Sequence, residues 1–406
     1  MALVNGKRSM MSKTGTNPDL RMFFPKVALA GMIEVLHNQG YTVIAPALHR
    51  DVVKLKPITG SDEIARGVRD LQERGRYRLE EGDDDFFFDY VVGPDSAKSY
   101  FFPPRQELFA FDTESSRFVL NEGRAQIPKL ALLGIRACDL AAIRVQDRVF
   151  SGGDAAGLTR CEAELYYRRT RAQSMLIAVN CIRPGGTCFC DSMGTGPKAV
   201  EGFDLAMTEL SSGFVVEAGS EAGSALLRAL PVRDPSPAEL ELADMKIDLA
   251  SKRMGRILDT RDIVELLDRN IEHLEWDKVA RRCLSCGNCT MVCPTCFCST
   301  VSDSSDLDAR RVSRTRHWES CFTHQFSYTT MGPHRHTIRG RYRHWIRHKL
   351  GTWWEQFGTS GCVGCGRCIT WCPVGIDLTE EIAAIGGRSS KTGNEAEFPP
   401  EREVTK

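Results

Sequence analysis

The chain has 406 residues with 53 basic and 53 acidic side chains, so its formal net charge is zero. This length leaves room for two or three domains with substantial cores, and the balanced charge excludes a uniform field that would attract nucleic acid or an anionic membrane. Sixteen cysteines, with neither a secretory signal nor an apolar run of membrane-spanning length, predict a cytoplasmic protein with reduced thiols.

The first part of the chain alternates between helical and strand patterns. Residues 1–20 are polar and predict a flexible leader. Apolar residues at helical spacing over 26–36 predict a helix, and residues 41–46 and 86–92 predict strands. The acidic run 80–85 is interpreted as a solvated loop rather than a metal site, because clustered like charges repel one another.

Two later apolar runs, 129–135 and 174–179, have the character of buried parallel strands. Each is followed almost at once by a cysteine, Cys138 after the first and Cys181 after the second. Ligands in open α/β sheets bind beyond the carboxyl ends of the strands. Neighbouring strands lie about 4.8 Å apart, so two such cysteines can face one cofactor.

The loop after Cys181 is rich in glycine and contains Cys188 and Cys190. Together these residues suggest a third [4Fe-4S] site with the ligands Cys138, Cys181, Cys188 and Cys190. Their irregular spacing leaves two alternatives open, namely free buried thiols and a glycine loop that cradles a phosphate.

A proline-rich break at 231–237 is the predicted domain boundary. Residues 203–218 read as one more element pair before it, and residues 237–282 read as helical after it. We therefore expect an α/β (α+β) domain over 21–232, followed by a mainly α-helical, ferredoxin-like dicluster domain over 238–385. The polar residues 386–406 predict a disordered tail.

Two cysteine runs each have the spacing C-x₂-C-x₂-C-x₃-C-P, which is the ligand pattern of a cubane iron-sulfur cluster. Small residues such as Gly287 and Gly366 let the backbone wrap closely around three thiolates, and the fourth cysteine ligates the other cluster in two-cluster ferredoxins. The predicted ligands of the first [4Fe-4S] cluster are Cys283, Cys286, Cys289 and Cys372. Those of the second [4Fe-4S] cluster are Cys362, Cys365, Cys368 and Cys293.

Zinc is the competing interpretation, because it binds four thiolates as two C-x₂-C pairs separated by a long spacer. Here each run is a complete quartet, which favours iron-sulfur clusters. Four cysteines remain, namely Cys161, Cys296, Cys298 and Cys321. Cys161 belongs to no recognisable loop, and the other three are interpreted as thiols packed near the clusters.

The connection 294–361 between the runs is far longer than a turn and reads as helices. Its segment 310–349 is crowded with Arg, His and aromatic residues, among them Trp318, Tyr342 and Trp345. Such a composition can bind phosphates and stack bases, but it also provides cations that stabilise an anionic cluster. We favour the second interpretation and predict no nucleic-acid partner, because the segment lies inside the cluster module.

Several catalytic patterns are missing from the sequence. No G-x-G-x-x-G follows a predicted strand, and neither a Ser/His/Asp elbow nor an HExxH motif is present. The chain is therefore predicted to carry electrons without a flavin or NAD site of its own and without catalytic residues.

Four segments together resemble the beta, iron-sulfur subunit of cytoplasmic NAD(P)-linked [NiFe] hydrogenases, the sulfhydrogenases. They are the loop 181–197, the run 293–298 with its three cysteines, the segment around Cys321, and the run 351–377. The related A subunit of anaerobic sulfite reductase is similar in the dicluster part. The resemblance covers roughly residues 129–378.

The resemblance implies an electron-transfer subunit that sits between the large and small subunits of a [NiFe] hydrogenase and a flavin subunit that handles NAD(P). Two alternatives stay open. One is electron donation to an anaerobic sulfite reductase, and the other is a stand-alone iron-sulfur sensor, either a redox sensor or one that binds nucleic acid.

Overall fold

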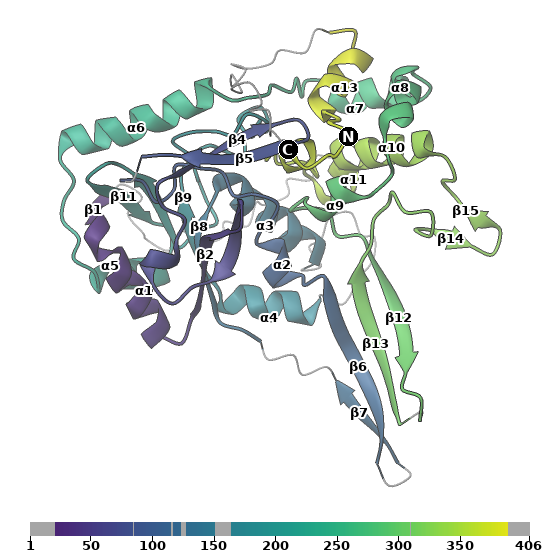
Figure 1. Ribbon diagram of the computed structural model, residues 1–406, viewed down its shortest axis with the longest axis horizontal. Coiled ribbons are helices and arrows are strands. Elements are labelled where there is room, and N and C mark those ends of the chain that lie inside the picture. The colour runs from purple at the N-terminus through teal and green to yellow at the C-terminus, as the bar shows by residue number, and fades with distance from the viewer. Residues whose placement is uncertain are drawn as a thin grey trace, which may run out of the picture.

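The computed structural model describes residues 21–83, 85–114, 117–122, 127–150, 164–308 and 310–388. The predicted leader, Cys161 and residues 389–406 of the predicted tail lie outside these ranges. Figure 1 shows a sheet-based part that holds the first half of the chain, a helical part formed by the second half, and a long arm of strands that projects from between them.

A seven-stranded mixed sheet forms the centre of the sheet-based part. Its four middle strands are parallel, and antiparallel strands flank them on both sides. In spatial order the strands are β1 (Arg21–Pro25), β11 (Gly213–Ala218), β10 (Leu205–Glu209), β9 (Met175–Val179), β8 (Leu130–Ile135), β2 (Thr42–His49) and β3 (Val52–Pro57). The expected strands at 41–46, 129–135 and 174–179 are therefore present, and the last two are direct parallel neighbours.

Both faces of this sheet are covered, which explains why β8 and β9 read as continuous apolar runs. Leu133 and Ile177 pack on one face, against α1 and α5. Leu132 and Leu176 pack on the other face, against α2, α3 and α4. The covering helices are α1 (Leu29–Asn38), α5 (Glu221–Arg228), α2 (Lys98–Phe101), α3 (Ala137–Phe150) and α4 (Leu165–Gln173).

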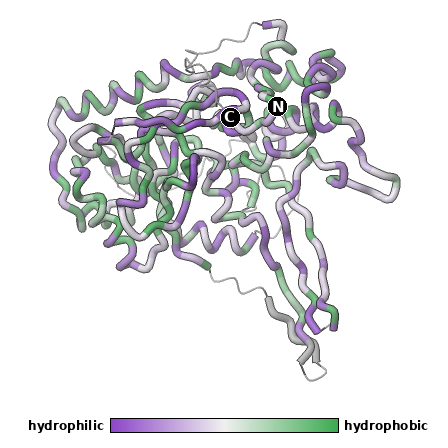
Figure 2. Tube along the Cα trace, in the orientation of Figure 1, coloured by the Kyte–Doolittle hydropathy of each residue, from purple (hydrophilic) through white to green (hydrophobic). Residues whose placement is uncertain are grey.

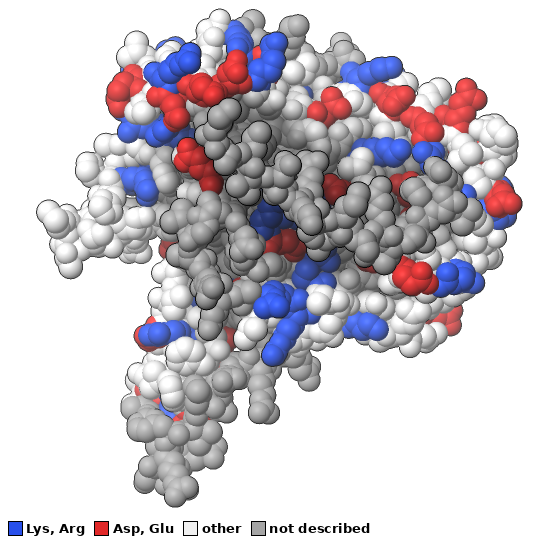
Figure 3. Space-filling view, turned by 180° about the vertical axis from the view of Figure 1, so that it is seen from behind, with Lys and Arg blue, Asp and Glu red and all other residues white. Residues whose placement is uncertain are grey.

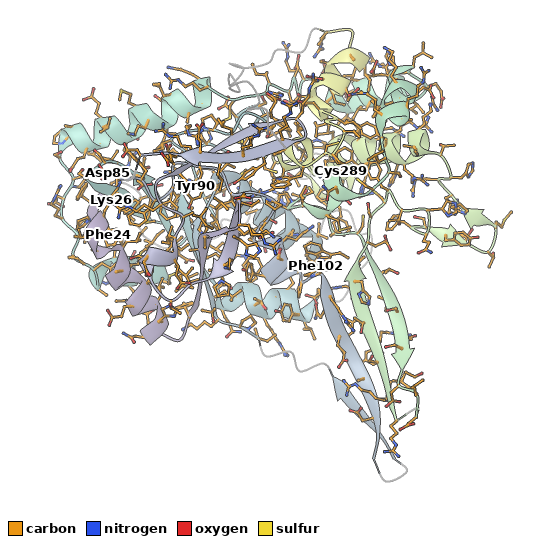
Figure 4. All side chains as sticks on the ribbon, viewed as in Figure 1. Phe24, Lys26, Asp85, Tyr90, Phe102 and Cys289 are labelled. Atoms are coloured by element: carbon orange, nitrogen blue, oxygen red, sulfur yellow. The ribbon has the colours of Figure 1, made fainter. Side chains whose placement is uncertain are left out.

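Residues 87–92 are buried, but residues 86–92 form no strand, so the strand prediction is wrong there. Side chains satisfy the backbone of this segment in place of a neighbouring strand. The Glu209 carboxylate accepts from the N–H groups of Phe87 and Phe88, each at 2.8 Å, and Arg136 donates to Phe88 O at 2.9 Å. Lys26 forms an ion pair with Glu209 at 3.1 Å and lies beside Asp85, as Figure 4 shows.

The helical part surrounds the two cysteine runs. Its elements are α7 (Ile263–Arg269), α8 (Glu275–Arg282), α9 (Asn288–Met291), α10 (Ile338–Arg347), the π-helix His348–Thr352, α11 (Trp353–Phe357), α12 (Arg367–Thr370) and α13 (Leu378–Ile385). Trp276, Ile346, Ile369 and Ile382 belong to its core, and Cys321 and Cys362 are packed into the same core.

The expectation of a mainly helical module is met only in part, because residues 299–333 form strands. Strands β12 (Ser299–Ser305) and β13 (Arg311–Trp318) form a hairpin, and β14 (Tyr328–Thr329) pairs with β15 (Gly332–Pro333). β13 also pairs with β6 (Arg105–Glu114), which pairs with β7 (Arg117–Glu122). Figure 2 colours most of the β12–β13 hairpin hydrophilic or neutral. Its sequence therefore lacks the apolar residues by which a buried strand is predicted.

Two further elements are a helix that packs on the sheet and a hairpin that reaches the helical part. Helix α6 (Pro237–Lys252) begins at the predicted proline-rich break, where Ser236 and Glu239 form a capping box. Ala243 of α6 packs on Leu210 and Val215 of the sheet-based part. The hairpin of β4 (Val68–Glu73) and β5 (Arg76–Glu81) reaches the second cysteine run, where Tyr77 stacks on Trp371 with ring centroids 5.2 Å apart.

Candidate iron-sulfur sites

The four cysteines predicted for the first cluster line a single cavity. It encloses about 30 Å³, and its other walls are largely apolar, with Phe322, Trp345 and Ile376 among them. The predicted ligands on its wall are Cys283 and Cys286 in the loop between α8 and α9, Cys289 in α9, and Cys372 just after α12. Cys368, in α12, also lines the cavity. Thiols around an apolar hollow are the donor set that a cubane takes, so these residues fit the group. Figure 4 labels Cys289 within the helical part.

Backbone geometry shapes the first loop around this cavity. Gly287 has φ +76° just before α9, and a Cβ there would lie 2.8 Å from Ser320 Oγ. A larger residue would therefore be strained and crowded. The Ser285 N–H points to Cys283 Sγ at 3.3 Å, which is the type of N–H···S contact that tunes a bound cluster.

Cys293 lies close to the second cysteine run, and it is also among the charged neighbours of Cys289 in the first run. Burial raises the pKa of Cys368, and the thiolates of Cys362, Cys365 and Cys293 raise it further. Burial likewise raises the pKa of Cys362 to about 12, against the opposing effect of Lys349. Without a metal Cys362 and Cys368 hold their protons at neutral pH, so cluster binding has to displace them.

The third predicted set also converges. Cys138 lies in the first turn of α3 after β8, and Cys181 follows β9, so the two cysteines come after neighbouring parallel strands. Burial raises the pKa of Cys190, and nearby Cys188 and Cys181 raise it further. Burial also raises the pKa of Cys138, which has Cys190 among its charged neighbours. All four thiols are buried.

The glycine loop of the third set packs directly on the second cysteine run. The Phe189 N–H donates to Gly364 O at 2.8 Å. Gly364 has φ +63°, and a Cβ on it would lie 2.6 Å from the Phe189 backbone. This close approach is a packing reason for glycine at position 364.

A buried cation joins the same two loops. Arg367, next to Cys368, forms an ion pair with Asp139, next to Cys138, at 2.9 Å, and both side chains are at most 2% exposed. Coulombic attraction to Asp139 keeps the pKa of Arg367 well above its usual value despite burial, and Cys365 and Cys138 add to this effect. A fixed positive charge between thiols stabilises the negative charge that clusters bring.

Sequence reasoning missed the two lysines that are buried among the cysteines. Lys349 Nζ lies 3.1 Å from Cys293 Sγ and donates to Gly361 O at 2.9 Å. Lys98 Nζ lies 3.7 Å from the centre of the Trp318 ring and donates to Cys296 O at 3.3 Å. Lys98 lies in a short helix more than 180 residues before the first cysteine run, so no local pattern could have identified it.

Cys296, Cys298 and Cys321 are packed near these lysines, as the prediction of packed thiols implied. The Cys321 thiol donates to Cys298 and lowers the pKa of Cys298 to about 7. The Cys296 thiol donates to Cys293 and holds the pKa of Cys293 well below its usual range. Coulombic attraction to Lys349 acts in the same direction on Cys293 and Cys298.

Most described arginines of the segment 310–349 already have acidic partners. Arg311 pairs with Glu107 at 2.7 Å, Arg314 with Asp303 at 2.7 Å and Arg343 with Glu272 at 2.8 Å. Tyr342 and Trp345 are buried, so neither ring is free to stack on a base. On the face in Figure 3, acidic and basic side chains lie next to each other along the upper edge.

Among the described residues, no group of three or more His, Cys, Asp or Glu side chains is placed to hold a single metal ion. No helix there is long and apolar enough to cross a membrane.

Comparison with known proteins identifies the family. Residues 282–376 match the model of a 4Fe-4S dicluster domain, which spans both cysteine runs. The chain is 30% identical over 329 residues to the beta subunit of sulfhydrogenase 2 from Pyrococcus furiosus, which covers 80% of this chain and 93% of that protein. No solved structure matches the chain. The chain thus belongs to the family of hydrogenase beta subunits represented by that protein, and it is an iron-sulfur protein with an electron-transfer role.

Proposed function

We propose that the chain passes single electrons between the large and small subunits of a [NiFe] hydrogenase and a flavin subunit that handles NAD(P). The relative in Pyrococcus furiosus is named as a sulfhydrogenase beta subunit, which supports a place in a hydrogenase complex. Bound [4Fe-4S] clusters would supply one-electron chemistry, while hydride transfer would belong to the flavin partner.

The observation that carries this proposal is that the three cysteine groups are contiguous. Cys368 lines the cavity of the first group and is also a neighbour of Cys362, Cys365 and Cys293 in the second. Cys365 in turn is near enough to Cys138 and Cys190 for its thiolate to raise the pKa of both. A series of neighbouring sites is the arrangement that an electron relay needs.

The ligand sets that we propose are those predicted from the spacing. Cys283, Cys286, Cys289 and Cys372 would hold the first cluster, because they surround one cavity. Cys362, Cys365, Cys368 and Cys293 would hold the second, and Cys138, Cys181, Cys188 and Cys190 would hold the third. Lys349 and the ion pair of Arg367 with Asp139 would stabilise the negative charge of the second and third sites.

The two ends of this series differ in exposure. Cys286 is exposed, and its neighbour Leu284 is 62% exposed, whereas the four cysteines of the third group are buried. We therefore infer that electrons enter or leave the chain at the first group by contact with a partner subunit that covers Leu284.

The test is to purify the native complex anaerobically and measure its nickel, flavin and sirohaem. Nickel together with flavin would support the hydrogenase relay. Sirohaem without nickel would move the chain to sulfite reduction, and iron alone would leave a stand-alone carrier or sensor. Either of the last two results would overturn the proposal.

The domain division predicted from the sequence remains a proposal as well. We propose an α/β domain over 21–232 and a dicluster domain over 238–385, with a boundary at the capping box that begins α6. Proteolysis of the native protein that cleaved first within 231–237 would support this boundary. First cleavage elsewhere in the described residues would argue against it.

A further inference from the structure

Helix α10 has a second hollow on the face that points away from the cluster loops. Tyr342 and Trp345 of α10 line the first cysteine cavity, whereas Gly340, Arg343 and Arg347 line this hollow. It encloses about 390 Å³, which is within the range of small-molecule sites. Its lining comes from the segment that joins β15 to α10, from α10 and from the π-helix, and Figure 1 shows how these elements are arranged.

The lining of this hollow is polar and basic. It contains three arginines, four histidines, two threonines and a glycine, and the part of the chain that the structure describes contributes no carboxylate to it. The arginines are Arg335, Arg343 and Arg347. A concave site with several guanidinium groups and no acidic lining attracts an anion.

Helical spacing places the basic side chains on one stripe. Arg343 and Arg347 are four residues apart, as are His344 and His348, whose rings are stacked with centroids 5.5 Å apart. Burial lowers the pKa of His344 to about 4, and nearby Arg335, His348 and Arg347 lower it further. The effect of the arginines on His344 reflects the positive potential inside the hollow, where a neutral His344 can still donate one N–H.

The arginines are held in place and keep donors to spare. Arg343 Nη1 donates to Ile271 O and to Glu272 Oε1, each at 2.8 Å, and Arg347 Nη2 donates to Asp268. A guanidinium has five N–H donors, so each arginine retains several after these contacts. The Nε of Arg347 is buried without a hydrogen-bond partner, and this unused donor belongs to a residue that lines the hollow.

We propose that this hollow binds a small molecule bearing phosphate, with Arg343 and Arg347 as the main ligands of the phosphate oxygens. The planar fork of a guanidinium matches phosphate geometry in two parallel hydrogen bonds. The π-helix His348–Thr352 supports the same assignment, because it places His348 and Thr352 on the wall of the hollow and such segments occur frequently at functional sites.

The experiment is isothermal titration of the anaerobically purified native protein with orthophosphate, pyrophosphate and ADP at constant ionic strength. Arg343→Gln should weaken binding about tenfold or more, since it removes charge-assisted hydrogen bonds. Arg339→Gln is the matched control. Arg339 lies on the same helix and pairs with the same Glu272, at 2.7 Å, but it does not line the hollow.

The outcomes separate cleanly. Absence of binding by all three ligands, or equal weakening by the Arg343 and Arg339 variants, would overturn the proposal. Tighter binding of ADP or pyrophosphate than of orthophosphate would identify a larger phosphate compound as the natural source, and the reverse order would identify free phosphate. Arg347→Gln gives a second test if the first variant fails to retain its iron. Nickel and flavin contents do not enter this measurement, so it can fail independently of the electron relay.

Discussion

The first cysteine group and the third are opposite solutions to holding thiols together. The first is built by one short loop and a single cysteine from a second loop, and Cys286 is exposed at the surface. The third is built by residues from two adjacent strand ends and a glycine loop, and all its thiols are buried. Local spacing therefore defines the first site, whereas the sheet topology defines the third.

The largest expected effect is the loss of the first cluster. Cys283→Ser removes a ligand thiolate from the loop site, so we expect the loss of roughly four irons per chain. Iron and acid-labile sulfide analysis of anaerobic protein measures this. Cys161→Ser is the control and should leave the iron content unchanged. Equal iron in both variants would refute the ligand assignment.

The corresponding substitution in the third cysteine group is Cys188→Ala. If the third site holds a cluster, the parent protein should contain about twelve irons per chain and the variant about eight. If the third set consists of free buried thiols, both proteins should contain about eight. The iron content therefore decides whether the third cysteine group binds a cluster, as proposed for the first group, or consists of packed thiols.

The next effect concerns Arg256, which joins the end of the second cysteine run to the loop of the third set. Arg256 donates to Asp377 at 2.6 Å, beyond the second cysteine run, and to Gly186 O at 2.8 Å in the loop of the third set. Asp377→Asn should lower the free energy of unfolding by about 3 kcal/mol, because it leaves a buried arginine partly uncompensated. Chemical denaturation under argon measures it.

The matched control for that variant is the exposed pair of Arg228 with Glu221, whose side chains are 65% and 81% exposed. Glu221→Gln should cost less than about 1 kcal/mol. A similarly small loss of stability for Asp377→Asn would mean that the pair of Arg256 with Asp377 does not hold the two loops together.

The last effect concerns the pH dependence of stability near the first loop. Burial raises the pKa of Glu381 from 4.5 to about 7, although Arg282, next to Cys283, opposes this with a hydrogen bond. The folded carboxyl thus keeps a proton that the unfolded chain releases, so stability falls as the pH rises from about 4.5 to about 7. The slope is at most about 1.4 kcal/mol per pH unit.

Glu381→Gln should flatten this part of the stability profile, as measured by denaturant midpoints between pH 5 and pH 8. Parallel profiles for the variant and the parent would show that Glu381 keeps an ordinary pKa. The profile above pH 7.5 should have the same shape in both proteins, because the carboxyl is ionised in both states there.

The sequence predicted what depends on local pattern. The cysteine spacing indicated two clusters, and the apolar runs before Cys138 and Cys181 indicated neighbouring parallel strands, which the structure contains. It did not reveal Lys98 or the ion pair of Arg367 with Asp139, because their partners are distant in the chain. The strand predicted over residues 86–92 was wrong for a similar reason, because side chains distant in the chain, those of Glu209 and Arg136, bind the backbone of this segment.

The pairing of β6 with β13 affects how the chain folds during its synthesis on the ribosome. Arg311 of β13 donates to Glu107 of β6, and these residues are 204 positions apart. During synthesis β6 therefore emerges long before the strand that covers its edge, and an uncovered edge can pair with other chains. The arm can close only after the first cysteine run and β13 (Arg311–Trp318) have been translated, so a chain truncated at the proline-rich break would leave β6 exposed and prone to aggregate.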